Sequence, residues 1–254
     1  MSGLVAGEGG GARGLPPSLS PFFRRLALLK SYLSEELGGG PRHLKLAWVI
    51  NAQKGGTLLY VGGLMWWWGQ SSVAAWVYLG LHGAYGLAWL LKELTFPDPG
   101  WQRRVTYGGA LSALLAVLLP YWVAPTLLVT GALGVGAERS GWLLGGCVLV
   151  HTLGLALMMG ADAQKFFTLR LERGLITTGF FARVRHPNYL GEVMIYGSYA
   201  LLVGHWLPWV VLGFVWGVVF ATNIAVKEAS MSRYPEWEGY RRRTGLILPK
   251  ILKS

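Results

Sequence analysis

Apolar runs about as long as a membrane is thick follow one another along the chain from residue 46 onward. A hydrocarbon core of ~30 Å is crossed by about 20 residues of α-helix. The runs predict six transmembrane helices, at Leu46–Trp68, Val73–Leu91, Thr106–Thr130, Gly141–Ala161, Asn188–His205 and Trp206–Val226. The fifth run is short and reaches the sixth through a turn at His205–Pro208, so these two are expected to form a tight hairpin. The predicted fold class is therefore an all-α, polytopic transmembrane helical bundle.

Prolines and glycines mark special points in this pattern. Pro120 and Pro125 lie within the third run, where proline removes a backbone N–H donor, so a kink is expected there. Small residues four apart let two membrane helices approach closely. Close contacts are predicted at two such pairs, Gly141 with Gly145 and Gly213 with Gly217.

The first forty residues differ from the rest. Gly7–Gly14 is rich in glycine and predicts a disordered segment. Ser20–Leu37 has apolar residues at helical spacing, with Ser20 as a suitable cap and Pro21 at the first helical position. Its apolar and basic faces predict a helix at the membrane interface, and a soluble helix packed on a neighbour is the alternative. The chain therefore divides into residues 1–40 and a transmembrane domain at 41–254.

Composition and charge support a membrane protein. The chain is 53% hydrophobic and 14% charged, whereas soluble domains carry about 25% charged residues. A net charge of +11 alone would suit a nucleic-acid binder, but basic residues alternating with apolar spans follow the positive-inside bias instead. Of the 23 Lys and Arg residues, only Lys54 falls within a span and only Arg139 in a turn on the far side. This pattern predicts an integral membrane protein with both termini on the cytosolic side, a lipid-bilayer partner and no nucleic acid.

Polar residues inside two spans are candidates for chemistry. Asn51, Gln53 and Lys54 lie in the first span, where a charge usually faces a bundle interior or a wet cavity. Lys54 is interpreted either as a snorkelling lysine or as part of the polar wall of a binding cavity. His82 and Tyr85 are three apart in the second span and share a helix face, where they could polarise a carbonyl or donate a proton. A structural, hydrogen-bonded histidine is the alternative.

Cysteine and the remaining histidines give no metal site. Cys147 is the lone cysteine and stands in an apolar run, so an internal disulfide is excluded and a packed small hydrophobe is expected. His151 and His205 have no partners at ligand spacing. We therefore predict no bound metal.

The densest chemical signal is the segment Asp162–Glu192, between the fourth and fifth spans. Five basic residues fall in this segment: Lys165, Arg170, Arg173, Arg183 and Arg185. Pro187 suits the first position of the next helix, whose free N–H groups favour a phosphate. His186, Asn188, Tyr189 and Glu192 surround that helix start with groups able to bind a ribose, an amide or a flat ring. The segment predicts a site for a nucleotide-like ligand, and attraction to anionic lipid head groups is the alternative explanation of its charge.

The residues RHPNYLGE, preceded by GLITTGFFARV and followed by RYPEWEGYRRRTGLILP, resemble the C-terminal region of a membrane superfamily. It includes steroid 5α-reductases, sterol C14 and C7 reductases and isoprenylcysteine carboxyl methyltransferases, and the chain is closest to its poorly characterised reductase-like branch. The resemblance covers about residues 141–249. It implies a helical bundle that admits a cofactor between its last spans, from the cytosolic side.

The resemblance also implies a cofactor. Asp162-Ala163-Gln164-Lys165, with Arg170 beyond it, is similar to a run that surrounds NADPH in the sterol reductases. The methyltransferases use S-adenosylmethionine, which is the alternative cofactor. Including positions after the sixth span where the reductases have further contacts, the expected cofactor-binding residues are Asp162, Gln164, Lys165, Arg170, Arg185, His186, Asn188, Tyr189, Glu192, Asn223, Lys227, Arg233, Tyr234 and Tyr240.

These features predict an NADPH-dependent reductase of an activated carbon–carbon double bond in a lipophilic, steroid- or isoprenoid-like substrate. Tyr85, His82 and Gln53 are the candidates for stabilising charge on the substrate oxygen. The chain departs from the 5α-reductases at their early Gln-Glu pair and the tyrosine of the next span, where it has Asn51-Ala52 and Gly83. Two alternatives therefore remain open: methyl transfer to a lipid-linked group, and a non-catalytic subunit of a membrane assembly.

Overall fold

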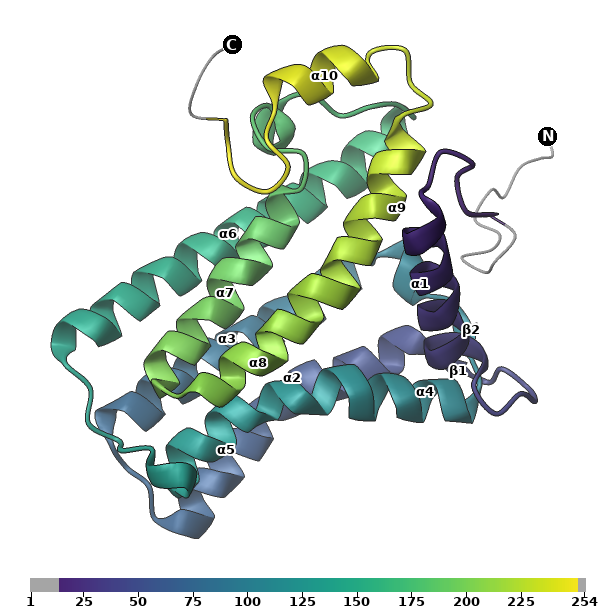
Figure 1. The fold of residues 1–254 in the computed structure, drawn as a ribbon. Coiled ribbons are helices and arrows are strands. Elements are labelled where there is room, and N and C mark those ends of the chain that lie inside the picture. Colours follow the sequence, from purple (N-terminus) through teal and green to yellow (C-terminus); the bar gives the residue numbers. More distant parts are fainter. Residues whose placement is uncertain (1–13, 251–254) are drawn as a thin grey trace.

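The computed structural model of the chain describes residues 14–250 and is a bundle of long helices (Figure 1). In this part of the chain the strands are limited to β1 (Leu44–Lys45) and β2 (Arg104–Val105), which pair antiparallel. The all-α fold class is confirmed. The predicted disordered segment Gly7–Gly14 lies, except for Gly14, outside the described residues.

Six helical stretches run back and forth along the bundle. They are α2 (Leu46–Trp68), α3 (Val73–Thr95), α4 to α5 (Tyr107–Thr130), α6 (Gly141–Leu171), α7 (Pro187–Val203) and α8 to α9 (Trp206–Met231). Within the described residues, α3, α4 to α5, α6 and α8 to α9 are long and apolar enough to cross a membrane. The α2 helix carries Asn51, Gln53 and Lys54, and α7 has 17 residues. Transmembrane placement of α2 and α7 therefore stays a prediction.

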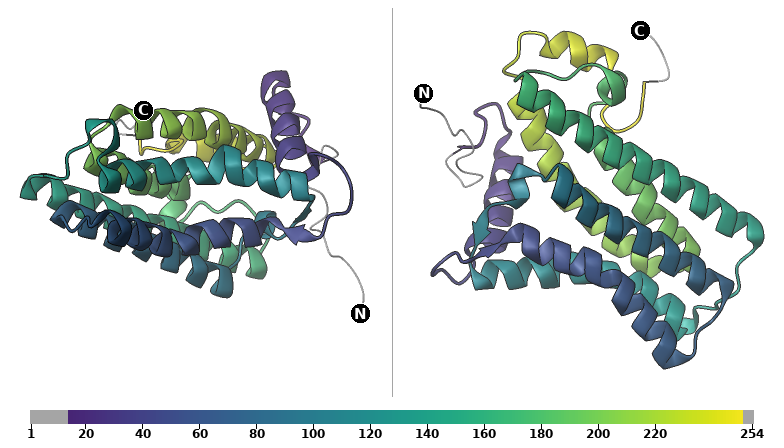
Figure 2. Two further views of the ribbon diagram at one scale, coloured as in Figure 1. Left: turned by 90° about the horizontal axis from the view of Figure 1, so that it is seen from below. Right: turned by 180° about the vertical axis from the view of Figure 1, so that it is seen from behind.

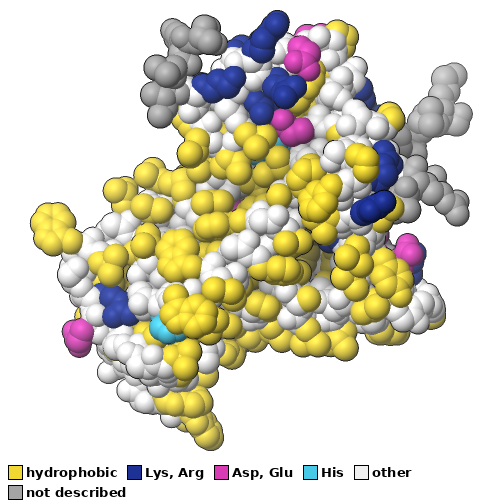
Figure 3. Space-filling view, in the orientation of Figure 1, with side chains coloured by type: hydrophobic (Ala, Val, Ile, Leu, Met, Phe, Trp, Pro, Cys, Tyr) yellow, Lys and Arg dark blue, Asp and Glu magenta, His cyan; other side chains and the backbone are white. Residues whose placement is uncertain are grey.

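The two ends of the bundle differ in the turns and short helices that lie there. The turns that join α2 to α3, α5 to α6 and α7 to α8 lie at one end, while α1 (Pro21–Ser31) and α10 (Trp237–Arg243) lie at the other (Figures 1 and 2). Gly69 and Gly204 end α2 and α7 in the left-handed conformation that glycine adopts at low cost. On the face seen in Figure 3, apolar side chains cover the middle, and Lys and Arg gather around α10 and α1.

Two of the apolar helices are irregular at mid-length. Pro120 lies in the 3₁₀ turn Leu119–Trp122 that follows the π-helical turn η4 (Leu114–Leu118), whereas Pro125 lies within the regular helix α5. A second π-helical turn, η8 (Val215–Phe220), joins α8 (Trp206–Phe214) to α9 (Ala221–Met231). Such turns are rare and are often found at functional sites.

Helix α6 is longer than the sequence indicated. The predicted span ended at Ala161, but the helix continues to Leu171. Backbone hydrogen bonds of a helix do not depend on side-chain polarity, so the change from apolar to polar residues at Asp162 marks a change of surroundings and not the helix end. Asp162 and Lys165 are consequently neighbours on one helix face.

The close contact between α6 and α7 is not where the glycine spacing placed it. A side chain at Gly141, Gly145, Gly213 or Gly217 would have no atom within 4 Å. Instead, α6 and α7 cross at Gly154 and Gly191, where a Cβ atom on Gly191 would lie 2.5 Å from the Gly154 carbonyl oxygen. Glycine spacing alone does not tell which face meets a neighbour.

The N-terminal helix α1 packs onto the bundle at the end that carries α10. Ser20 caps it and Pro21 is its first residue, as expected. The Ser18 hydroxyl donates to the Ala229 carbonyl on α9 at 3.0 Å, while Phe22 and Leu29 are exposed on the opposite face. The helix thus combines the two predicted features, packing on a neighbour and an exposed apolar face.

Candidate functional site

Four cavities adjoin one another toward the end of the bundle that carries α1 and α10. The outer cavity, about 220 Å³, lies between α6, α7, α9 and the C-terminal segment. The α1 cavity, about 340 Å³, lies between α1, α9 and the loop after α3. The loop cavity, about 580 Å³, lies between that loop and α6. The inner cavity, about 110 Å³, extends between α2, α7 and the turns η4 and η8.

Charged side chains form the walls that these cavities share. Lys227 lines the outer, α1 and inner cavities, and Asp98 lines the α1, loop and inner cavities. Lys165 belongs to the outer and loop cavities, and Asn188 to the outer and inner ones. Of the cofactor residues predicted from the sequence, all except Gln164 line at least one of the four cavities.

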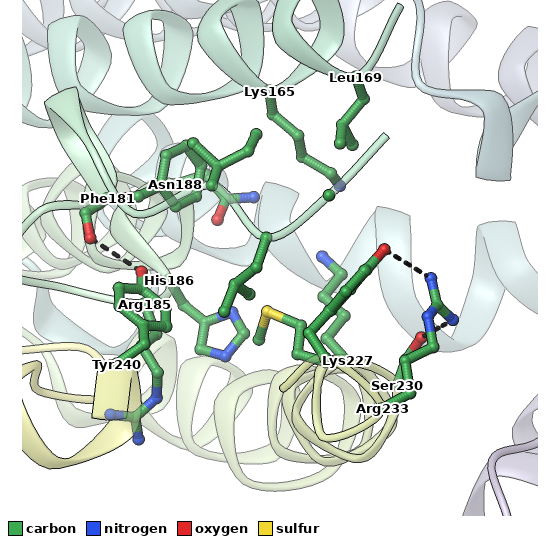
Figure 4. A pocket seen from close by; sticks show the side chains of 15 residues that line it. Lys165, Leu169, Phe181, Arg185, His186, Asn188, Lys227, Ser230, Arg233 and Tyr240 are labelled. Carbon is green, nitrogen blue, oxygen red and sulfur yellow. Dashed lines mark hydrogen bonds between the residues drawn. The ribbon is translucent and has the colours of Figure 1, made fainter. Parts of the chain in front are cut away.

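The outer cavity brings together side chains from three helices. Figure 4 shows Lys165 from α6, Asn188 from α7 and Lys227 from α9 with their polar ends directed toward the same space. The α7 helix begins at Pro187, as the sequence predicted, so Asn188 stands in its first turn. Two ammonium groups and an amide therefore face one cavity at a helix N-terminus, an arrangement that favours an anionic ligand.

Arg185 lines the same cavity, but its guanidinium group is occupied. Its Nε donates to both oxygens of Glu228, at 3.0 and 3.1 Å, and its terminal nitrogen Nη1 donates to the Thr244 carbonyl at 2.7 Å. The backbone next to it is also tied, since Val184 forms a parallel bridge with Gly245. These bonds fasten the C-terminal segment to α9, and the phosphate contact predicted for Arg185 stays a prediction.

His186 takes part in the same network. Its Nε2 lies 2.8 Å from Glu228, and it precedes α7 without capping it through its side chain. Burial lowers the pKa of His186 below its ordinary value, although the hydrogen bond with Glu228 opposes the shift. The imidazole is therefore neutral at neutral pH, so one of its nitrogens donates a hydrogen bond and the other accepts one.

Gln164 and Arg170 occupy the outer side of α6. The Gln164 amide donates to the Thr178 carbonyl at 3.0 Å and accepts from the Phe180 N–H at 2.9 Å. Both ends of this amide hold the loop before Arg185, and the cofactor contact predicted for Gln164 stays a prediction. Arg170 lies over the ring of Phe166 and lines the loop cavity.

Three residues after the sixth predicted span close the outer cavity. Arg233 donates to the Ser230 hydroxyl and to the Tyr234 phenol, each at 3.0 Å. Tyr240 donates to the Phe181 carbonyl at 2.8 Å. Burial raises the pKa of Tyr240 to about 12, so its phenol keeps this proton at neutral pH. These groups shape the cavity wall.

A chain of hydrogen bonds links the cavities. Lys227 donates to the Tyr189 phenol at 3.1 Å and lies over its ring. Asn223, one helix turn before Lys227, accepts a hydrogen bond from Lys30 of α1. Tyr189 and Asn223 both line the α1 and inner cavities. The predicted residues Tyr189, Asn223 and Lys227 therefore form one wall.

Lys54 is the central polar residue of the inner cavity. Its Nζ donates to the phenol of Tyr85 at 2.9 Å and to that of Tyr196. The same nitrogen lies 4.6 to 5.2 Å from the ring centroids of Tyr85, Trp89, Tyr121 and Tyr196. With 5% of its surface exposed, Lys54 does not snorkel. The four π faces and two phenol oxygens hold a buried cation.

Carboxylates balance part of the positive charge around the inner cavity. Asp162 accepts from Lys92 at 2.5 Å, and both side chains line the inner and loop cavities. Glu192 lines the inner cavity together with Lys54. Within residues 14–250 no ion pair within 4 Å is found for Glu192. Its carboxylate is therefore available to a ligand.

Asp98 is a site residue that the sequence did not reveal. Its carboxylate accepts from the Gly100 N–H at 2.7 Å and lies in the wall of three cavities. Burial alone would raise its pKa, but the charges of Lys165, Lys227 and Lys92 outweigh burial and hold the pKa below its ordinary value. Asp98 is thus ionised and faces three lysines.

The other candidates for catalysis lie in the helix core. His82 is 2% exposed, bonds to the Tyr78 phenol at 3.1 Å and stacks on Tyr199. It lines none of the four cavities, and its catalytic role stays a prediction. Gln53 is also buried, and its side-chain oxygen has no hydrogen-bond partner among the described residues. Of the three candidates, Tyr85 alone contacts a cavity residue, through Lys54.

Metal ligands were not predicted from the sequence. No group of three or more His, Cys, Asp and Glu side chains able to hold a metal ion occurs between residues 14 and 250. Cys147 is buried and free, packed as a small apolar residue.

The chain matches a known protein family over its second half. The family described as "Protein of unknown function (DUF1295)" matches residues 112–244, more than half of the sequence. The chain belongs to this family. The match contains the outer cavity's Lys165, Asn188 and Lys227, whereas Lys54, Lys92 and Asp98 precede it.

Individual relatives extend the comparison. The mouse Delta(14)-sterol reductase TM7SF2 is 27% identical over 251 residues, which cover 90% of this chain and 51% of that protein. Uncharacterized protein C594.04c of Schizosaccharomyces pombe is 31% identical over 94 residues, 34% of this chain and 27% of that protein. Uncharacterized protein C7D4.09c of the same yeast is 44% identical over 41 residues, 16% and 15% of the two chains. This DUF1295 chain thus spans about half of the mouse protein and less of the yeast proteins.

Some residues of the site could be found in the sequence of this DUF1295 chain, and others could not. Lys54 stood out as a charge within an apolar run. Asp98 stood in a short loop with two prolines, FPDPGW, that carried no recognisable motif. Tyr196 resembled any core tyrosine, and its link to Lys54 is a side-chain hydrogen bond between α2 and α7 that forms only in the folded bundle.

Proposed function

We propose that the protein is a membrane-embedded reductase that uses NADPH to reduce an activated carbon–carbon double bond in a lipophilic, steroid- or isoprenoid-like substrate. The observation that carries this proposal is the shared wall between the outer and inner cavities. There Lys227 and Asn188 face both a basic cavity at a helix N-terminus and a cavity that reaches into the apolar bundle. Distant similarity to a sterol reductase over most of the chain supports it.

The outer and loop cavities fit a dinucleotide. Its phosphates need cationic donors, which Lys165 and Lys227 supply in the outer cavity and Arg170 in the loop cavity. The amide of Asn188 can bond to ribose or to a carboxamide, and the ring of Tyr189 offers a flat surface in the wall of the inner cavity. NADPH, when bound, supplies the hydride. Arg185 and Gln164 contribute by holding the loop and the C-terminal segment in place.

The inner cavity fits the reacting end of a lipophilic substrate. Its apolar wall comes from the π-helical turns η4 and η8: Val117 and Leu118 of η4, and Val215, Val219 and Phe220 of η8. Its polar end is formed by Lys54 and Glu192. When hydride adds to the β-carbon of an enone, negative charge develops on the substrate oxygen. The Lys54 ammonium, fixed by Tyr85 and Tyr196, is positioned to stabilise that charge.

The positive end of the bundle suits the cytosolic side of a membrane. The ends of the described chain, at residues 14 and 250, both lie at the end of the bundle with α1 and α10 (Figure 1). Basic residues favour the cytosolic face, where a soluble dinucleotide reaches the outer cavity. We propose this orientation.

Binding of the two candidate cofactors tests the proposal directly. Detergent-purified protein is titrated with NADPH and, separately, with S-adenosylmethionine, and tryptophan fluorescence is recorded, because Trp89 and Trp101 line the inner cavity. The expected result is saturable quenching by NADPH. Binding of only S-adenosylmethionine would favour methyl transfer, and binding of neither would favour a non-catalytic subunit.

Single substitutions test whether NADPH binds in the outer cavity. Removing one cationic donor from a phosphate typically costs ~1.5–3 kcal/mol, or about tenfold or more in affinity. Lys165→Gln and Lys227→Gln are expected to weaken NADPH binding by that amount. Arg173→Gln, an exposed cation on the same segment that lines none of the four cavities, should bind like the parent protein. Equal affinity in all three variants would remove the outer cavity from the proposal.

A further inference from the structure

The α1 cavity has a lining that does not follow from reductase chemistry. Four parts of the chain enclose it: α1 with the π-helical turn η2 (Tyr32–Glu36), the loop after α3, the first turn of α7, and α9. The N-terminal part is held firmly in place. The Thr106 N–H donates to the Glu35 carbonyl at 3.0 Å, and the Thr106 hydroxyl donates to the Leu37 carbonyl at 2.8 Å. The cavity is therefore a built feature of the fold.

Positive charge exceeds negative charge in its lining. The charged residues that line it are Lys30, Arg103, Lys227, Glu35 and Asp98. Three cations face two carboxylates, so one positive charge has no counter-charge within the wall. Glu35 is already engaged, since it accepts from Arg103 at 2.9 Å and from the Ser31 hydroxyl at 2.7 Å.

Lys30 is crowded by like charge. It comes from α1, bonds to Asn223 on α9 and faces Arg103, Lys227 and Glu35. Burial, followed by the charges of Arg103 and Lys227, lowers the pKa of Lys30 to about 8, and Glu35 opposes this only in part. An anion placed among these three cations would relieve the crowding.

Arg103 supplies an unused donor. Its Nε atom is buried and has no hydrogen-bond partner among the described residues. A buried guanidinium donor without an acceptor costs free energy. One oxygen of a ligand at this point would satisfy it. The unpaired Nε is independent of the charge count and points to the same kind of ligand.

The outer surface of α1 places the cavity near the membrane surface. Phe22, Leu29 and Leu33 are exposed, and they recur on one side of the N-terminal helix. Apolar side chains on an amphipathic helix enter the boundary between head groups and acyl chains. The cavity beneath α1 then lies at the depth of lipid head groups on the positive side of the bundle.

We propose that the α1 cavity is a binding site for a phosphate-type anionic group, such as the head of an anionic membrane lipid, held by Lys30, Arg103 and Lys227. The site shares Lys227 with the proposed dinucleotide site and differs from it in its other two cations. Lys30 and Arg103 line neither the outer nor the loop nor the inner cavity. The ligand here is recognised by residues outside the DUF1295 match, apart from Lys227 and its neighbours on α7 and α9.

Sulfate tests the chemistry, because it is a dianion that does not titrate near neutral pH. The thermal midpoint of the full-length protein in detergent is measured against sulfate concentration, with chloride keeping the ionic strength constant. A saturable rise is expected for the parent protein. Lys30→Met and Arg103→Gln should weaken the apparent affinity about tenfold, and Arg25→Met, an exposed cation of the same helix, should leave it unchanged.

Two further measurements make the outcome decisive. NADPH titration of Lys30→Met should give the parent affinity, which also shows that the variant is folded. In nanodiscs, phosphatidic acid mixed with phosphatidylcholine should stabilise the parent protein over phosphatidylcholine alone, and Lys30→Met should lose that gain. If sulfate acts but phosphatidic acid does not, the anion comes from solution. Absence of a sulfate effect, an equal effect in all variants, or weaker NADPH binding by Lys30→Met would each overturn a separate anion site.

Discussion

The Nζ atom of Lys54 donates a hydrogen bond of 2.9 Å to the phenol oxygen of Tyr85, which lies on the neighbouring helix. Tyr196 of α7 completes the group, since it accepts from Lys54 and donates to Tyr85 at 3.2 Å. No carboxylate pairs with Lys54 within 4 Å among residues 14–250. The ammonium group is therefore stabilised by phenol oxygens and aromatic rings, and loss of either phenol leaves part of its charge unsatisfied.

The loss of stability caused by removing the Tyr85 phenol should depend on whether Lys54 is present. Tyr85→Phe removes an acceptor from a buried cation, and we expect a cost of ~1–3 kcal/mol. Lys54→Met removes the buried charge itself, and an apolar residue of similar size is often neutral or stabilising in such a place. Tyr85→Phe should therefore lower the thermal midpoint strongly in the parent protein and weakly in Lys54→Met.

A second tyrosine provides the control for this cycle. Tyr60 bonds to Thr126 at 2.7 Å, away from Lys54, so Tyr60→Phe should cost the same with or without Lys54→Met. Thermal unfolding in detergent measures all six proteins. If Tyr85→Phe is equally costly in both backgrounds, the bond between Lys54 and Tyr85 does not stabilise the bundle.

Arg185 should control the attachment of the C-terminal segment. Arg185→Lys keeps the positive charge, but a single ammonium cannot reach Glu228 and the Thr244 carbonyl together. Loss of one charge-assisted bond, worth ~1.5–3 kcal/mol, should raise the rate of tryptic cleavage at residues 241–243 about tenfold. Arg183→Lys, at an exposed position two residues earlier, should be cleaved like the parent protein. Unchanged cleavage in both variants would show that the segment is held by other contacts.

The sequence predicted the helices better than their ends and faces. The bounds of the helix Leu46–Trp68 and the helix start at Pro187 agree with the structure, because hydropathy and proline are local signals in the sequence. The end of α6 was predicted ten residues too early, since polarity changed at Asp162 while the helix continued. The close crossing at Gly154 and Gly191 depends on how α6 and α7 are rotated, which local spacing does not specify.

The site was predictable where its residues lie in one motif. Lys165 and Asn188 line the outer cavity as the segment Asp162–Glu192 indicated. Within the same motif, Arg185 and Gln164 bond to protein groups, and nothing in their spacing distinguishes a ligand contact from a loop anchor. Asp98 and Lys30 were not identified because their roles arise from elements far apart in the chain that meet only after folding.

The α6–α7 crossing should tolerate no side chain at Gly191. A Cβ atom there would lie 2.5 Å from the Gly154 carbonyl oxygen and 2.7 Å from the Met158 nitrogen, both of them backbone atoms that cannot move aside alone. Gly191→Ala should therefore lower the free energy of unfolding by ~1–3 kcal/mol or more. This loss would be seen as a lower thermal midpoint and a lower yield of monodisperse protein. Gly197→Ala, on the same helix with nothing within 4 Å of its Cβ atom, should raise the free energy of unfolding by ~0.5–1 kcal/mol. Equal midpoints for the two variants would mean that the helices do not approach this closely.

Stability should rise with pH in the alkaline range because of Lys30. Its pKa is about 8 in the folded protein, against an ordinary value of 10.5. Between these two values the unfolded chain holds the proton and the folded protein does not, so raising the pH favours the folded form. Below pH 8 both states hold the proton and the cost of burying it is fully present.

The thermal midpoint of the parent protein, followed from pH 7 to 10.5, should therefore contain a rising contribution that is missing in Lys30→Met. Arg25→Met, on the exposed side of the same helix, should retain the parent slope. An identical slope in Lys30→Met would mean that the Lys30 ammonium group is not held among Arg103 and Lys227 in a buried cavity, because only burial and like charge lower its pKa.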